Sequence, residues 1–174
     1  MKIANTKPNY LIIPLITIVT AVVGSVITSK GMSWYQTIAL PAWTPPGAII
    51  GAVWTLLFVL ATISALIVWN KVERTWIFKH IIRFFIMNAV VNVLWSAVFF
   101  GVHLLGLAVI AAGILALTVI MLVLLIWKSS RTAALLLVPY AVWVVFATYL
   151  SYAIWDLNLR LAAPWPCLST GTCF

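Results

Sequence analysis

The chain has 174 residues, of which 66% are hydrophobic and only 7% carry a charge. Soluble domains carry about a quarter charged residues, so this composition excludes a soluble protein and indicates a membrane protein. The ten Lys and Arg residues outnumber the two acidic residues. They lie in short clusters between apolar runs, as they do in the loops of membrane proteins, so we expect no nucleic-acid partner.

Five apolar segments follow one another along the chain. Each is close to the roughly 20 residues that a helix needs to cross about 30 Å of hydrocarbon, and the alternating pattern of a barrel strand is absent. The sequence therefore predicts an all-α membrane protein, a five-transmembrane-helix bundle forming a single domain over residues 1–158. The helices are predicted at about residues 10–29, 46–69, 84–102, 107–127 and 133–155, and residues 159–174 are expected to form a poorly ordered tail.

The basic residues are unevenly divided between the two ends of these helices. One end carries Lys2, Lys7, Lys71, Arg74, Lys79, Arg83, Lys128 and Arg131. The other end receives only Lys30 and Arg160. The positive-inside rule then places the N-terminus in the cytoplasm and the C-terminus outside. The first segment lacks a signal-peptide cleavage site and is read as a retained anchor, so we expect a multi-pass protein of a bacterial cell-envelope membrane, with an organellar membrane as the alternative.

The approach to the second helix is rich in proline, glycine and tryptophan. Pro41, Pro45 and Pro46 fix a rigid, extended backbone, and Pro46 can occupy the first helical turn, where its missing N–H costs nothing. We expect this loop to lie outside, as the lid of a site, with Trp43 as an interfacial anchor.

The third helix carries two carboxamides. At 100° per residue, Asn88, Asn92, Trp95 and Phe99 share one face. Carboxamides must point into the bundle, because lipid offers them no hydrogen-bond partner. They either join helices by hydrogen bonds or anchor a ligand, and the pattern leaves both readings open.

The second and fifth helices carry aromatic side chains on one face. These are Trp54 and Phe58 on the second helix and Tyr140 and Trp143 on the fifth, where Ala147 and Leu150 share the same face. Membrane helices pack best through small residues, so repeated inward tryptophans should hold the helices apart and leave a cavity. By contrast, Ala108, Ala112 and Ala116 on the fourth helix form a small-residue stripe suited to close packing, either inside the bundle or in a homodimer.

Residues for conventional catalysis are scarce. No carboxylate lies inside any apolar segment, and His80 and His103 lie at segment ends. The two cysteines, Cys167 and Cys173, could form a disulfide in an oxidising compartment but are too few for a metal site, so we expect no metal.

Several motifs occur together in the chain. They are Trp-Tyr at 34–35, Pro-x-Trp-Thr-Pro-Pro-Gly at 41–47, Gly-x-Val-Trp at 51–54, Asn-x2-Trp-Ser-x2-Phe-Phe-Gly at 92–101 and Pro-Tyr-x2-Trp-x2-Phe-Ala-Thr-x-Leu-x-Tyr-x2-Trp at 139–155. In these motifs the chain resembles the TspO/translocator protein family, also called tryptophan-rich sensory proteins or peripheral-type benzodiazepine receptors.

The resemblance implies a bundle, often dimeric, with a pocket opening toward the first loop. Family members bind porphyrins such as protoporphyrin IX and haem, benzodiazepine-type ligands and, in animals, cholesterol. The family's pocket residues match Trp54, Asn92, Trp143 and Ala147, and Trp34 matches an aromatic of the pocket lid. No Lys or Arg closely follows Tyr152, so the animal cholesterol motif is incomplete here.

We therefore expect a membrane receptor or sensor that binds tetrapyrroles in a tryptophan-lined pocket under the first loop. The alternatives are a transporter of porphyrins or other amphiphiles, and a light-dependent porphyrin-degrading enzyme that uses Trp54 and Trp143. No cofactor is obligatory, since porphyrin or haem would be the ligand, and the other expected partner is membrane lipid. The predicted ligand-binding residues are Trp34, Trp54, Phe58, Asn88, Asn92, Trp95, Phe99, Tyr140, Trp143, Ala147 and Leu150.

Overall fold

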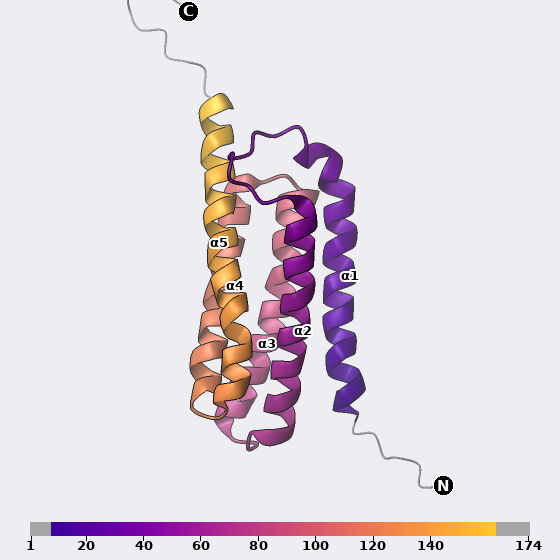
Figure 1. The fold of residues 1–174 in the computed structure, drawn as a ribbon, viewed down its shortest axis with the longest axis vertical. Coiled ribbons are helices and arrows are strands. Elements are labelled where there is room, and N and C mark those ends of the chain that lie inside the picture. Colours follow the sequence, from indigo (N-terminus) through magenta and orange to yellow (C-terminus); the bar gives the residue numbers. More distant parts are fainter. Residues whose placement is uncertain (1–7, 163–174) are drawn as a thin grey trace, which may run out of the picture.

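The computed structural model describes residues 8–162. The elements are α1 (Asn9–Tyr35), α2 (Gly47–Lys71), α3 (Trp76–Ser96), the π-helical turn η1 (Ala97–Gly101), α4 (Leu105–Trp127) and α5 (Arg131–Ala162) (Figure 1). Within this range there is no strand, and five helices are long and apolar enough to cross a membrane. The prediction of an all-α, five-helix membrane protein is confirmed.

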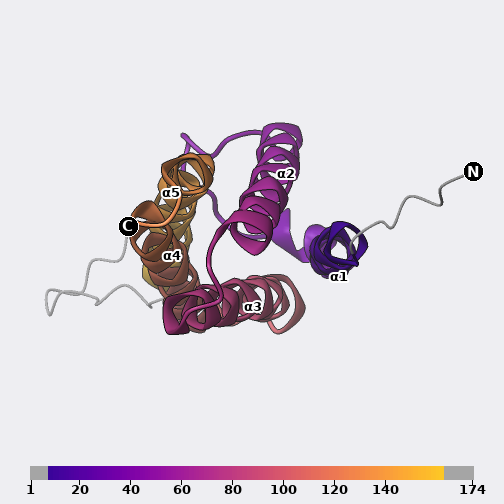
Figure 2. The same cartoon turned by 90° about the horizontal axis from the view of Figure 1, so that it is seen from below.

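The helices run side by side along the long axis of the bundle (Figure 1). Viewed along that axis, α4 and α5 lie together, α3 and α2 flank them, and α1 lies at the edge of the bundle (Figure 2). The α4–α5 pair makes the most extensive contact, as expected for an antiparallel hairpin with a short connection. The first residue of α1 and the last of α5 lie at opposite ends of the bundle (Figure 1).

Close packing inside the bundle accounts for the small-residue stripe of α4. Ala108, Ala112 and Ala116 are buried, and Gly24 of α1 lies against the hydroxyl of Ser96. Small side chains let helix backbones approach, which is the main source of packing energy between helices in a membrane. The α4 stripe is therefore used within one copy of the chain and is not an exposed surface.

Three helices are longer than predicted. The first continues past residue 29 to Tyr35, because Lys30, which lies more than one turn before the helix end, can extend its amine to the interface while its stem stays apolar. The third begins at Trp76 rather than near residue 84, since Lys79 and Arg83 lie on its first turns without ending it. The fifth continues past residue 155 to Ala162, while the predicted tail from residue 163 on, with Cys167 and Cys173, lies outside the described residues.

The start of α2 differs from the prediction in one detail. Pro46 is not in the first helical turn but is the N-cap, with an extended ψ of 141°. Its carbonyl oxygen accepts hydrogen bonds from the backbone N–H groups of Ile49 and Ile50 at 2.9 and 3.1 Å. The proline therefore ends the rigid loop and its carbonyl starts the helix.

Candidate functional site

One cavity of the structure, which we call the loop cavity, has a volume of about 810 Å³. It lies between α1, α2, α3, η1 and α5, and Gln36 and Leu40 of the loop that joins α1 to α2 also line it. Most of the predicted ligand-binding residues line it, namely Trp54, Phe58, Asn92, Trp95, Phe99, Trp143, Ala147 and Leu150. Among them, α2, α3, η1 and α5 each contribute an aromatic side chain to one space.

The aromatic walls of the loop cavity are in contact with one another. The ring of Trp54 stacks on that of Trp95, with centroids 6.3 Å apart and an angle of 28° between the planes. Trp143 packs on Phe146 at 5.3 Å, and Trp95 on Phe99 at 5.7 Å. Such wide side chains hold α2, α3 and α5 apart, which is why the space between these helices is not filled.

Two polar atoms in these walls have no hydrogen bond. The indole nitrogens Nε1 of Trp95 and Trp143 are buried and have no hydrogen-bond partner among residues 8–162. A buried donor without an acceptor costs about 1–3 kcal/mol. These two N–H groups are buried donors beside the cavity that lack an acceptor. Both belong to residues that the helical period places on inward faces.

The π-helical turn η1 explains why the third helix contributes more aromatic surface than predicted. An extra residue in the turn Ala97–Gly101 shifts the helical register. As a result both Phe99 and Phe100 line the loop cavity, and their rings are in contact at 4.7 Å. Regular helical spacing had placed only Phe99 on the inward face.

Asn88 and Tyr140 do not line the loop cavity. The Asn88 amide nitrogen donates to the Thr118 hydroxyl at 2.8 Å, and the Tyr140 hydroxyl donates to the Asn88 carbonyl oxygen at 3.0 Å. Asn92 joins the same cluster, because its amide nitrogen donates to the Tyr140 oxygen at 3.3 Å. The cluster links α3, α4 and α5, so Asn88 takes the interhelical role, whereas Asn92 both joins the cluster and lines the cavity.

Trp34 also lies outside the loop cavity. It is on the last turn of α1, not in a loop, and its ring stacks on the imidazole of His103 with centroids 4.1 Å apart. Its other neighbour is Phe99, in an edge contact at 5.9 Å. His103 has a left-handed backbone, with φ of 63°. These contacts join the end of α1 to the connection between η1 and α4.

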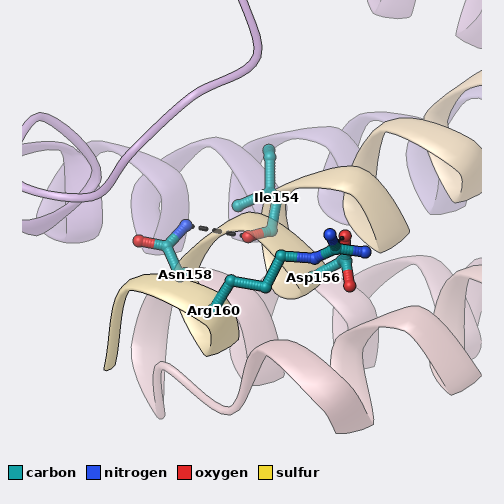
Figure 3. Close-up of polar contacts among 4 residues, drawn as sticks. All are labelled: Ile154, Asp156, Asn158 and Arg160. Atoms are coloured by element: carbon teal, nitrogen blue, oxygen red, sulfur yellow. Dashed lines mark hydrogen bonds and ion pairs between the residues drawn. The ribbon is translucent and has the colours of Figure 1, made fainter. Parts of the chain in front are cut away.

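Asn158, which the sequence motifs do not mark as a site residue, holds the loop over the cavity. Its carbonyl oxygen accepts from the Ala39 N–H at 3.0 Å, and its amide nitrogen donates to the Ala39 carbonyl at 2.9 Å. The same nitrogen also donates to the Ile154 carbonyl at 2.8 Å (Figure 3). The sequence predicts Asn158 only as the last residue of the domain, yet its spacing of four from Ile154 continues the inward stripe of α5.

Trp43 makes the second attachment of the loop to α5. Its ring stacks on Tyr149 with centroids 5.5 Å apart and a 16° angle, and meets Phe146 edge-on at 6.0 Å. Trp43 remains 46% exposed. It is therefore both a loop anchor and a surface aromatic.

A smaller cavity of about 490 Å³ lies between α1, α2 and α3, toward the end of the bundle that holds Asn9. We call it the Asn9 cavity. Thr20, Phe58 and Asn92 line both cavities. No group of three or more His, Cys, Asp or Glu residues in the described range could hold a metal ion.

The chain is similar to one family of membrane proteins and to several of its members. The model of the TspO/MBR family matches residues 12–156. The chain is 33% identical to the tryptophan-rich protein TspO of Bacillus cereus over 156 residues, covering 87% of this chain and 98% of that protein. It is 31% identical to protein CrtK of Rhodobacter capsulatus, covering 72% of this chain and 79% of that protein. It is 28% identical to the human translocator protein, covering 76% of this chain and 79% of that protein.

The family match spans most of the chain and all five apolar helices. The bacterial relatives also fit the expected location in a bacterial membrane. The motifs that carried the resemblance lie at the loop, in α2, in α3 with η1, and in α5, which are the parts that surround the loop cavity. The chain is a multi-pass membrane protein that belongs to the TspO/MBR family.

Proposed function

We propose that the chain is a membrane receptor or sensor that binds a tetrapyrrole, such as protoporphyrin IX or haem, in the loop cavity. The volume of about 810 Å³ is within the range of about 300–1,000 Å³ that is common for small-molecule sites. The indole faces of Trp54, Trp95 and Trp143 suit a flat, apolar ring system, because aromatic rings stack face to face with an offset or edge to face.

The unpaired indole N–H groups of Trp95 and Trp143 carry the proposal. A purely hydrocarbon ligand would leave both donors unsatisfied, whereas a ligand with carbonyl or carboxylate oxygens can pair with them. A porphyrin combines a flat apolar ring with propionate groups. Both indole nitrogens are buried in the ligand-free protein. A ligand oxygen would therefore reach them only as the ligand moves the aromatic side chains of the cavity wall apart. Binding should therefore change the tryptophan fluorescence.

The side of the membrane that the loop cavity is proposed to face follows from the distribution of basic residues. Lys71, Arg74, Lys128 and Arg131 lie at one end of the bundle, in or beside the α2–α3 and α4–α5 connections. The positive-inside rule supports placing this end in the cytoplasm. The loop cavity would then face the outer side of the membrane, where it could receive a ligand from that side or from the outer leaflet.

The test is a titration of the purified protein with protoporphyrin IX, followed by porphyrin absorbance and tryptophan fluorescence. Replacing Trp143 by Phe keeps an aromatic ring and removes the N–H, so we expect the Kd to rise about 5- to 150-fold, the equivalent of one hydrogen bond of roughly 1–3 kcal/mol. Trp76→Phe is the matched control, because Trp76 is 68% exposed and lies on the first turn of α3, far from the cavity. Equal affinity in the Trp143 variant and the wild type would refute the proposal.

Transport of the same ligands is the second candidate. It is favoured by the two cavities, which share Thr20, Phe58 and Asn92 and so adjoin each other along the bundle. Counterflow of a porphyrin in proteoliposomes distinguishes it from binding alone. A transporter exchanges external for internal porphyrin at a rate that rises with the amount of protein in the vesicles. A receptor leaves the internal porphyrin unchanged.

A further inference from the structure

The Asn9 cavity differs from the loop cavity in the chemistry of its walls. Its polar lining residues already make hydrogen bonds inside the protein; these residues are Asn9, Thr17, Thr20, Asn88, Asn92 and Tyr140. Asn9, for example, donates to the Asn70 carbonyl oxygen at 3.2 Å. The remaining walls are apolar side chains. An occupant therefore gains contact without having to supply hydrogen bonds, so the cavity suits a hydrocarbon chain.

The Asn9 cavity reaches the apolar outer surface of the bundle. Ile12 and Ile16 of α1 and Ile86 of α3 line it, and they are 52%, 49% and 56% exposed on the surface of the bundle. In a chain that spans the membrane, this surface faces lipid. Because α1 lies at the edge of the bundle (Figure 2), a lipid chain can enter sideways between α1 and α3 without crossing the loop.

A cation lies at the end of this opening. Lys79 is exposed on α3, three residues before Ile82, which also lines the cavity, so the two side chains lie on neighbouring parts of one helical face. Arg83 is exposed on the next turn. A basic residue next to the membrane surface attracts anionic headgroups.

We propose that the Asn9 cavity is a lipid site that holds one acyl chain of an anionic membrane lipid, with the headgroup at Lys79. The chain fills the space between Ile12, Phe85 and Ala65, and the headgroup remains at the membrane surface. This site adjoins the proposed tetrapyrrole site but has walls of its own, because Ala61, Ala65 and Ala89 line only the Asn9 cavity.

The test uses the full chain in vesicles of phosphatidylglycerol or phosphatidylcholine, each with a trace of the same lipid carrying a photoreactive acyl chain. Labelled peptides are identified by mass spectrometry after irradiation. We expect labelling of the α3 segment that contains Ile82, Phe85 and Ile86, stronger with the anionic lipid than with the zwitterionic one. Lys79→Gln should reduce the preference for the anionic lipid.

Ala65→Phe would fill the cavity, and Ala52→Phe is its control on the exposed face of α2. The introduced phenyl ring would displace about two methylene groups of the bound acyl chain, and the burial of each of them stabilises the bound state. Labelling of the chain should therefore fall about tenfold or more in the Ala65→Phe variant and stay unchanged in the Ala52→Phe control. Ala89→Leu narrows the same cavity from α3 and should act in the same direction. The melting temperature and protoporphyrin binding of each variant are measured in parallel, so that a failure of the lipid site is distinguished from a failure of the loop cavity.

Equal labelling of the wild type, Ala65→Phe and Ala89→Leu would overturn the assignment. So would labelling confined to the outward residues Val90 and Leu94, which are exposed and do not line the cavity. Equal labelling by the two lipids would overturn the headgroup position at Lys79.

Discussion

The attachment of the loop to α5 by Asn158 gives a sharp test of how the site is closed. Asn158→Ala removes both hydrogen bonds to Ala39, at 2.9 and 3.0 Å, and leaves the helix itself able to form. A hydrogen bond of this kind contributes about 0.5–1.5 kcal/mol net, so the closed loop should lose about 1–3 kcal/mol. The open population should then rise roughly 5- to 150-fold.

The measurement is amide hydrogen exchange of peptides that cover residues 36–46, with the protein in a bilayer or detergent. Exchange that proceeds through local opening follows the open population, so the loop should exchange faster by about the same factor. Asn158→Asp keeps the acceptor for the Ala39 N–H and loses the donor, and should give an intermediate rate. Exchange in α4 should stay the same in both variants.

Asn70→Ala is the matched control. It removes an amide of the same size whose hydrogen bond to Asn9 lies at the other end of the bundle, so loop exchange should not change. The reasoning is wrong if the loop of the Asn158→Ala protein exchanges at the wild-type rate. Trp43, stacked on Tyr149, would then hold the loop without the amide pair.

Two further substitutions test the packing around the site. Asn88→Leu removes the acceptor of the Tyr140 hydroxyl and the donor to Thr118, so we expect the unfolding free energy to fall by about 1–3 kcal/mol; a melting temperature equal to that of the wild type would contradict the cluster described here. Gly31→Ala places a Cβ against the carbonyl oxygen of Phe100, so we expect α1 to separate from η1 and the Trp34–His103 stack to weaken. Proteolysis at the α1–α2 loop should report this separation, and Gly51→Ala, where a Cβ meets open space, should leave it unchanged.

Much of the bundle follows from residue type and helical period. The five apolar lengths predict the helices, and the 100° period places Trp95 with Asn92 and Trp143 with Ala147 on the faces that line the loop cavity. These inferences hold because polar residues in a membrane helix almost always face the interior of the bundle or a cavity.

Other features depend on contacts between distant residues, which no local pattern contains. Asn88 and Asn92 share a face and lie one turn apart on α3, yet Asn88 pairs with Thr118 and does not line the loop cavity, whereas Asn92 does. The bond from Asn158 to Ala39 joins residues 119 apart in sequence. Trp34 is on a helix and not in the loop because α1 ends at Tyr35 instead of near residue 29. The end of a helix is the feature that an apolar run predicts least accurately.

The position of α1 at the edge of the bundle has a consequence for the order of assembly. The buried residues of α1 are Asn9, Thr20, Gly24 and Gly31, all small or polar, whereas α4 buries Leu115, Val119, Leu122 and Ile126 among others. The first of the five helices can pair with α2 through Asn9–Asn70 and Thr62–Thr17, but it cannot complete its packing until η1 has been made, because Gly31 packs on Phe100. Its 27 apolar-rich residues can remain in lipid as an independent span until then. The first of the five helices would thus complete its packing late, and both cavities would acquire their final wall only at that step.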